Sequence, residues 1–198
     1  MSVKVAVRVR PYNEREKNMG ATCCIKMNGP MTVINDPEGN PREFTFDFSF
    51  WSHDGFVDDD GISVKDSPDS IYDDQERVYE VLGKQVLDNA WSGYHCCLFA
   101  YGQTGSGKSY SMVGYGKNEG IVPKACNEIF RRINANDDDK NQFEVQFSML
   151  EIYNEKVQDL LVNQKNKPAG GLKVRENKGL VYVQDLSKHA VDSYERIA

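Results

Sequence analysis

The octapeptide Gly102–Ser109, GQTGSGKS, matches the pattern GxxxxGK[ST] in full and limits the possible folds of this chain more than any other segment. With average residue frequencies, a chance match in a chain of this length has odds of roughly one in a hundred. An apolar run, Cys96–Tyr101 (CCLFAY), precedes the octapeptide, and a helical pattern resumes near Lys108. Strand, loop and helix follow one another as such a loop requires, so the sequence predicts a phosphate-binding loop in an α/β fold.

Each part of the octapeptide suits an anionic ligand. The glycines let the backbone bend so that several N–H groups point at one anion, and a helix that follows the loop presents further N–H groups. We expect Lys108 to reach the β- and γ-phosphates and Ser109 to offer its hydroxyl to Mg²⁺. The predicted nucleotide-binding residues of the loop are Gly102, Gln103, Thr104, Gly105, Ser106, Gly107, Lys108 and Ser109.

The bulk properties exclude several classes of protein. The net charge is −6, from 24 basic and 30 acidic residues, whereas a nucleic-acid binder usually has a basic excess. No apolar run approaches the length that spans a bilayer, and the N-terminus alternates like a strand instead of carrying the apolar stretch of a signal peptide. The five cysteines include two adjacent pairs and no CxxC spacing, which favours reduced thiols in a cytosolic protein.

The remaining polar residues have ordinary interpretations. The three histidines are far apart in the sequence, so surface or hydrogen-bonded histidines are expected rather than metal ligands. Two acidic stretches, Asp54–Asp74 and Asp137–Asp139, are predicted to be solvated loops.

Hydrophobic periodicity gives a coarse secondary structure of alternating strands and helices around a mixed sheet. Strands are predicted at Val3–Arg10, Cys24–Asn35, Phe44–Phe50, Cys96–Tyr101 and Phe143–Tyr153, with a hairpin formed by Leu172–Arg175 and Leu180–Val183. Helices are predicted at Asp74–Trp91, from Lys108, from Val122 with Pro123 in its first turn, at Glu155–Leu161 and from Asp192.

Segments around the octapeptide resemble the kinesin motor domain. The run FAYGQTGSGKSYSMVG (Phe99–Gly114) is similar to the kinesin nucleotide-binding signature, and VAVRVRPYNERE (Val5–Glu16) resembles the strand that opens a kinesin motor. Further matching segments are EGIVPKACNEIF (Glu119–Phe130), MLEIYNEKVQDLL (Met149–Leu161) and LKVRENKGLVYVQDLS (Leu172–Ser187). The run DFSFWSHDGF and Ser109 resemble the kinesin-3 group most. The resemblance covers essentially the whole of residues 1–198 as one domain and implies a P-loop NTPase-type mixed sheet flanked by helices.

This resemblance implies roles that the residues alone do not settle. Arg8, Arg10 and Pro11 would line the adenine pocket, and Tyr79 would stack near the base. Without the resemblance, Pro11 is better interpreted as the end of a strand and Tyr79 as ordinary helix packing. Gln103–Ser106 would supply backbone N–H groups, and Tyr110 would lie beside the phosphates. The basic residues Lys173, Arg175 and Lys178 would lie on or near a hairpin that touches the microtubule, although three basic residues near a turn are also typical of a solvated surface.

Two sequence motifs that the resemblance implies for kinesin catalysis are not found in these residues. Neither the NxxSSRSH switch nor the DLAGSE segment occurs, and the DxxG strings Asp36–Gly39 and Asp58–Gly61 read as turns. The catalytic residues therefore stay unassigned, and we expect a motor domain truncated within the helix before the first switch. The implied activity is a microtubule-stimulated ATPase that uses ATP or ADP with Mg²⁺, on cytoplasmic microtubules (tubulin), with no cargo specified.

Two alternatives remain open from the sequence. One is a truncated nucleotide-binding fragment without motor activity, which the missing switches favour. The other is a kinase that uses the same loop, with Glu151 or Asp159 as the carboxylate that activates an acceptor hydroxyl.

Overall fold

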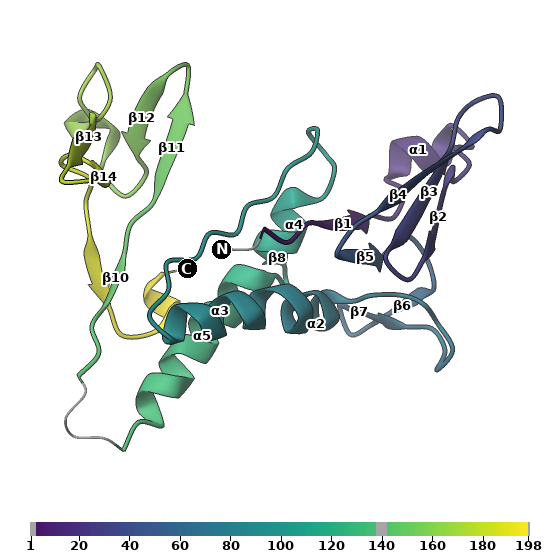
Figure 1. The fold of residues 1–198 in the computed structure, drawn as a ribbon, viewed down its shortest axis with the longest axis horizontal. Coiled ribbons are helices and arrows are strands. Elements are labelled where there is room, and N and C mark those ends of the chain that lie inside the picture. Colours follow the sequence, from purple (N-terminus) through teal and green to yellow (C-terminus); the bar gives the residue numbers. More distant parts are fainter. Residues whose placement is uncertain (1–2, 138–141, 198) are drawn as a thin grey trace. The chain divides into compact units, whose positions relative to one another are not determined.

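Figure 1 shows the computed structural model of the chain, which describes residues 3–137 and 142–197. The chain divides into two compact units, residues 1–125 and 126–198, and each is described by itself. Of the second acidic stretch, Asp138 and Asp139 lie outside the described residues, and Asp137 is exposed. No helix in the described part of the chain is both long and apolar enough to cross a membrane.

The first unit alternates short strands and helices. Its elements are β1 (Ala6–Val9), α1 (Glu14–Asn18), β2 (Ile25–Asn28), β3 (Met31–Asn35), β4 (Pro41–Thr45), β5 (Phe48–Trp51), β6 (Phe56–Asp59), β7 (Ile62–Lys65), α2 (Gln75–Val78), a π-helical turn (Tyr79–Gly83), α3 (Lys84–Trp91), α4 (Lys108–Met112), β8 (Gly114–Tyr115), β9 (Asn118–Glu119) and the first residues of α5 (Ile121–Asn134). Among the described strands, β1 and β5 form the one parallel pair, and the other ladders are antiparallel.

The core of this unit forms where β5 meets the helical stretch that begins with α2. Phe50, Val78, Tyr79 and Ile121 are buried together, and burying side chains of this size contributes about 1.5–3 kcal/mol each. The predicted helix Asp74–Trp91 is confirmed, because α2, the π-helical turn and α3 follow one another without a break. Asp74 is its N-cap and accepts a hydrogen bond from the backbone N–H of Arg77 at 2.7 Å.

Two predicted strands in this unit are each divided. The segment Cys24–Asn35 is a hairpin, since β2 and β3 pair antiparallel across a turn at Gly29, where φ is +56°. The alternating run Phe44–Phe50 changes sheets at Phe46: β4 pairs with β3, whereas β5 pairs with β1. Hydrophobic periodicity shows which side chains alternate, but it does not show which neighbouring strand a segment pairs with. The points at which these two segments divide were therefore not predicted.

The stretch Asp54–Asp74 is more ordered than a solvated loop. It contains the hairpin β6–β7, closed by a hydrogen bond from the Gly61 N–H to Asp58 Oδ1 at 3.0 Å, so the DxxG string there is a turn as predicted. The string Asp36–Gly39 is also a turn. Asp73 departs from the prediction, because its carboxylate accepts the backbone N–H of Trp51 at 3.0 Å and burial raises its pKa.

The apolar run Cys96–Tyr101 was predicted as a strand and is irregular in the structure. Leu98 packs against the core, whereas Phe99 is 77% and Tyr101 is 96% exposed. A strand needs a hydrogen-bonded neighbour, and within the described residues this run pairs with none.

The second unit consists of the rest of α5 and three antiparallel strand pairs. Its other elements are β10 (Val145–Phe147), β11 (Leu150–Tyr153), β12 (Lys156–Asp159), a 3₁₀ turn (Gln164–Asn166), β13 (Val174–Asn177), β14 (Leu180–Val183), β15 (His189–Val191) and a second 3₁₀ turn (Tyr194–Arg196). The predicted helix with Pro123 in its first turn is confirmed as α5, and the predicted hairpin is confirmed as β13–β14. The helix predicted from Asp192 is only the second 3₁₀ turn.

Two predictions in this unit are wrong. Glu155–Leu161 is not a helix, because Asn154 and Glu155 adopt φ values of +48° and +63° and close a two-residue hairpin between β11 and β12. The run Phe143–Tyr153 is not one buried strand either: β10 pairs with β15, and every residue of β11 is exposed.

Candidate functional site

The glycine-rich loop lies in the first unit, between the irregular run and α4. Gly102, Gly105 and Gly107 have φ values of +150°, +80° and +94°, where side chains with a Cβ are strained. A Cβ at Gly102 would also lie 2.5 Å from the Ser106 hydroxyl, so any other residue at this position would force the Ser106 side chain to move. Gly107 is the N-cap of α4, whose first residue is Lys108.

The lysine of the loop folds back over it. Lys108 Nζ donates hydrogen bonds to the carbonyl oxygens of Gly102 and Gln103, both at 2.8 Å. Within the part of the chain that the structure describes, the N–H groups of Gly105, Gly107 and Lys108 donate to no backbone carbonyl. The loop thus gathers a cation and free N–H donors, which is the composition of an anion cradle.

Arg10 is the predicted adenine-pocket residue that the structure brings against this loop. A Cβ on Gly107 would lie 3.7 Å from Arg10 Cβ. The Arg10 guanidinium makes a two-pronged pair with Glu16, at 2.7 and 2.6 Å, and donates to the Pro11 carbonyl at 2.7 Å. These hydrogen bonds, first of all those from Arg10, lower the pKa of Glu16 to about 2. Glu16 also completes the capping box of α1 with Asn13.

An aromatic cluster, which sequence reasoning missed, adjoins Arg10 and Pro11. The Tyr12 and His53 rings meet edge to face at 4.4 Å, and Trp51 approaches His53 at 5.5 Å. His53 is buried, and its Nδ1 lies 3.0 Å from the Arg10 carbonyl oxygen, so it is the hydrogen-bonded histidine that was predicted. No sequence pattern joins position 12 to position 53, because the contact depends on β1 and β5 being parallel neighbours.

Arg8, in β1, occupies an interior position with polar partners from three other segments. Its Nε donates to the Ser52 hydroxyl at 2.8 Å, and its Nη1 donates to Gln75 Oε1 at 2.7 Å and to the Ser111 hydroxyl at 3.0 Å. The guanidinium carbon lies 5.3 Å from the centre of the Tyr110 ring. Burial lowers the pKa of Arg8 and raises the pKa of the nearby Tyr72 to about 12.

Gln75 is a second residue of this interior network that the sequence analysis did not single out. Its Nε2 donates to the carbonyl oxygens of Tyr110 at 2.7 Å and Asn118 at 3.1 Å. A signal was present, because Gln75 is polar yet falls at helical spacing with Val78, Tyr79 and Leu82 on the apolar face.

The structure therefore groups most of the predicted residues around the loop. Arg10 lies beside Gly107, Pro11 follows Arg10, and Tyr110 lies in α4. Tyr79 is instead 8% exposed within the hydrophobic core, where its ring faces Gly83. Base stacking by Tyr79 stays a prediction.

The second unit holds the remaining candidates. Arg175 lies in β13 and donates to Gln184 Oε1 at 3.0 Å, and Lys178 occupies the turn of the β13–β14 hairpin at φ +50°.

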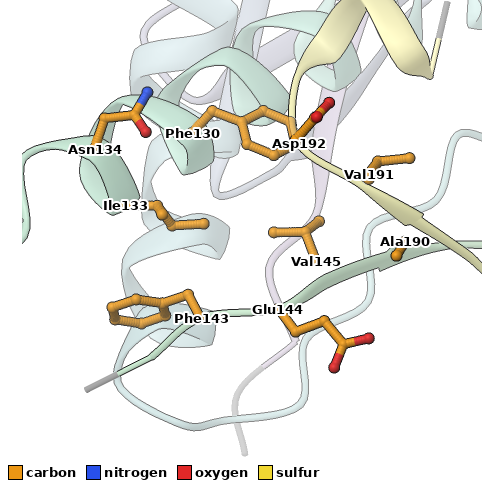
Figure 2. A pocket seen from close by; sticks show the side chains of 9 residues that line it. All are labelled: Phe130, Ile133, Asn134, Phe143, Glu144, Val145, Ala190, Val191 and Asp192. Carbon is orange, nitrogen blue, oxygen red and sulfur yellow. The ribbon is translucent and has the colours of Figure 1, made fainter. Parts of the chain in front are cut away.

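A groove of about 350 Å³ also lies in this unit (Figure 2). Its lining consists of Phe130, Ile133, Asn134, Phe143, Glu144, Val145, Ala190, Val191 and Asp192. None of the predicted site residues is among them.

A loop of this sequence and geometry places the chain among the P-loop nucleotide-binding proteins. Within that class, the family model of the kinesin motor domain matches residues 8–198. The chain therefore belongs to the kinesin family, as the resemblance predicted.

Individual relatives agree with this assignment. The kinesin-like protein KIF28 of Mus musculus is 46% identical over 99% of this chain, and KIF1B of Homo sapiens is 48% identical over all of it. The kinesin-related protein 1 of Dictyostelium discoideum is 46% identical, also over the whole chain. The matches to KIF1A and KIF1B, which are kinesin-3 proteins, confirm the predicted similarity to that group. The chain spans 19%, 10% and 9% of KIF28, KIF1B and kinesin-related protein 1.

Solved structures confirm the α/β P-loop NTPase-type fold. A structure of KIF14 with ADP, in complex with a microtubule, is 38% identical with a TM-score of 0.85 over 99% of this chain. A structure of a fast kinesin is 30% identical with a TM-score of 0.81, again over 99% of this chain. The chain spans 52% and 50% of those two solved chains.

Proposed function

We propose that residues 1–198 form the nucleotide-binding part of a microtubule motor, which binds ATP or ADP with Mg²⁺ and couples hydrolysis to movement along microtubules. Membership of the kinesin family supports the general activity. The observation that carries the proposal for these residues is the loop itself, which holds the Lys108 ammonium and, within the described residues, N–H groups at Gly105, Gly107 and Lys108 that donate to no backbone carbonyl.

The loop residues fit a polyphosphate. Among the described residues, the lysine ammonium donates to two carbonyl oxygens of the loop, which a phosphate oxygen can replace with a stronger, charge-assisted hydrogen bond. The positive φ values at Gly105 and Gly107 give the tightly turned backbone that glycine permits, and the absence of a Cβ at Gly102 leaves room for the Ser106 side chain. We assign the phosphates to Gly102–Lys108 and to the neighbouring Tyr110.

The residues around the loop also suggest where Mg²⁺ and the adenine of the nucleotide would bind. Ser109 is exposed at the start of α4, where its hydroxyl is available to Mg²⁺. Arg10 lies beside Gly107 of the loop, and we assign Arg10 and the adjacent Pro11 to the adenine. The Tyr12 and His53 rings pack together next to them, and His53 Nδ1 contacts the Arg10 carbonyl oxygen. Arg8 and Tyr79 are kept as adenine-side residues by family resemblance. The nucleotide supplies the phosphoanhydride bond, and these residues bind and orient it.

The partner and the location rest on relatives. The KIF14 structures are complexes with microtubules, so we propose microtubules as the partner of this chain, and the microtubule cytoskeleton of the cytoplasm as its location. On these residues, Lys173, Arg175 and Lys178 supply positive charge at the β13–β14 hairpin, which suits the acidic surface of a microtubule.

The test is a microtubule-stimulated ATPase assay on a motor domain that contains residues 1–198, with Lys108→Ala as the inactive control. We expect hydrolysis to rise with microtubule concentration and to be lost in Lys108→Ala. A folded motor domain whose ATPase rate does not respond to microtubules would contradict the proposal.

A second proposal concerns residues 1–198 taken alone, namely that they bind nucleotide without motor activity. It is favoured by one sequence observation, the lack of both NxxSSRSH and DLAGSE in these 198 residues. Saturable nucleotide binding together with no stimulated turnover would support this alternative.

A further inference from the structure

Gln75 is a buried polar residue whose side chain connects three segments of the first unit. The residue is 6% exposed. Its carbonyl oxygen accepts from Arg8 Nη1 at 2.7 Å, and its amide nitrogen donates to the carbonyl oxygens of Tyr110 at 2.7 Å and Asn118 at 3.1 Å. Both ends of the amide are thus used, which is what burial of this group requires.

The bond to Tyr110 matters because α4 is only five residues long. The last carbonyl groups of a helix have no partner within it. Here the chain leaves the helix at Gly114, where φ is +84°, so the Tyr110 carbonyl depends on a donor from elsewhere. Gln75 is that donor, and it holds the C-terminal end of the helix that begins with Lys108.

Arg8 links the same helix to β1. Its Nη1 is shared between Gln75 and the Ser111 hydroxyl, while its Nε is fixed by Ser52. Gln75 and Ser111 therefore attach α4 to a guanidinium that β1 holds in place. Because Lys108 and Ser109 lie on α4, the position of their side chains depends on this attachment.

We infer that Gln75 is a positioning residue for nucleotide binding, acting through Arg8 and the Tyr110 carbonyl on the helix that carries Lys108 and Ser109. The inference rests on the proposed nucleotide site and adds to it a residue that is outside the loop and does not touch the ligand.

The test compares Gln75→Met with wild type in Mg²⁺-dependent binding of a fluorescent (methylanthraniloyl) ADP analogue to the 198-residue chain. Methionine keeps the length of the side chain and removes both hydrogen-bonding ends. Thr32→Val is the matched control, since Thr32 is also buried and hydrogen-bonded, to Ser49 at 3.0 Å, but lies in β3. We expect Gln75→Met to weaken binding about tenfold and Thr32→Val to change it less than twofold, at a temperature where thermal melts show all proteins folded.

Two further measurements separate positioning from general destabilisation. Hydrogen exchange without ligand should be faster in Gln75→Met at the Ser111 and Val113 amides, and unchanged in β2–β3. Ser111→Ala should also weaken binding, and the double variant should lose less than the sum of the single effects, because both act through Arg8.

The outcomes are distinguishable. The inference is overturned, and the proposed function left standing, if wild type binds the analogue and the affinity of Gln75→Met is within twofold of the wild-type affinity. Equal losses of affinity in Gln75→Met and Thr32→Val have the same consequence. A folded wild-type chain that shows no saturable binding overturns both.

Discussion

Gly83 offers a test of the core in which two opposing effects can be compared. It is the last residue of the π-helical turn and is buried. A Cβ at this position would clash with two ring carbons of Tyr79 and lie 3.0 Å from Ile121 Cγ2. The backbone of Gly83 is helical, with φ of −64°, so alanine brings no backbone strain.

Replacing Gly83 by alanine should therefore raise helix propensity and overpack the core. The gain in helix propensity is about 1 kcal/mol. Overpacking a filled core costs about 1–3 kcal/mol, and contacts as short as these place the cost toward the upper end, because the Tyr79 ring must move among Phe50, Val78 and Ile121. We expect Gly83→Ala to lower the free energy of unfolding by about 1–2 kcal/mol and the Tm by about 2–8 °C.

The assay is thermal and urea unfolding followed by circular dichroism. Asn89→Ala is the control, since Asn89 is exposed in α3 and its substitution changes helix propensity without filling the core. That control should be neutral or slightly stabilising. A Gly83→Ala chain as stable as wild type, or more stable, would refute the reasoning and show that the ring of Tyr79 is free to give way.

Four other substitutions test the loop, an ion pair and a turn. Gly105→Ala should weaken binding of the fluorescent ADP analogue about fivefold, because the Cβ position of Gly105 has open space around it and the substitution adds only backbone strain from the positive φ. Gly102→Ala should weaken binding more, because a Cβ at Gly102 would also meet the Ser106 hydroxyl. The hydrogen bonds from Arg10 lower the pKa of Glu16 from 4.5 to about 2, so the ionised carboxylate stabilises the fold above pH 4.5 and loses that effect as the pH falls through about 2. The Tm difference between wild type and Glu16→Gln should accordingly shrink between about pH 6 and pH 2, and a constant difference would contradict the assignment. Glu155→Gly should stabilise the chain by about 0.5–1 kcal/mol in urea unfolding, because Glu155 sits at φ +63° in a two-residue turn that favours glycine, and a loss of stability would count against that turn.

The parts of the fold that the sequence predicted well are those set by local chemistry. The phosphate-binding loop is visible because glycine, lysine and serine act within eight consecutive residues. The helix that begins at Gln75 is visible because Asp74 caps it and its apolar face repeats at helical spacing. The β13–β14 hairpin is visible because Lys178 and Gly179 mark its turn.

The parts that the sequence predicted poorly depend on backbone angles or distant partners. Nothing in the residue types of Asn154 and Glu155 forces two positive φ values, so the strand β12 after them was taken for a helix. The apolar composition of Cys96–Tyr101 fits a strand, but the pairing that makes a strand depends on neighbours elsewhere in the chain.

The same division holds for the candidate site. Lys108 and Ser109 follow from the motif, and Arg10 and Pro11 follow from family resemblance. Gln75, Tyr12 and His53 do not, because their contacts join segments tens of residues apart in sequence. The long-range network around Arg8 is thus a finding of the structure alone.

The central claim, that the loop at residues 102–109 is a working Mg²⁺-nucleotide site, is tested most directly by titrating the 198-residue chain with the fluorescent ADP analogue in the presence and absence of Mg²⁺. Lys108→Ala removes the ammonium that folds over the loop, and Lys117→Ala is the matched control, an exposed lysine paired with Asp60 outside the loop. We predict saturable, Mg²⁺-dependent binding by wild type and Lys117→Ala, and a loss of at least about tenfold in Lys108→Ala. Equal binding by wild type and Lys108→Ala, or no binding by a chain that is demonstrably folded, would contradict the claim.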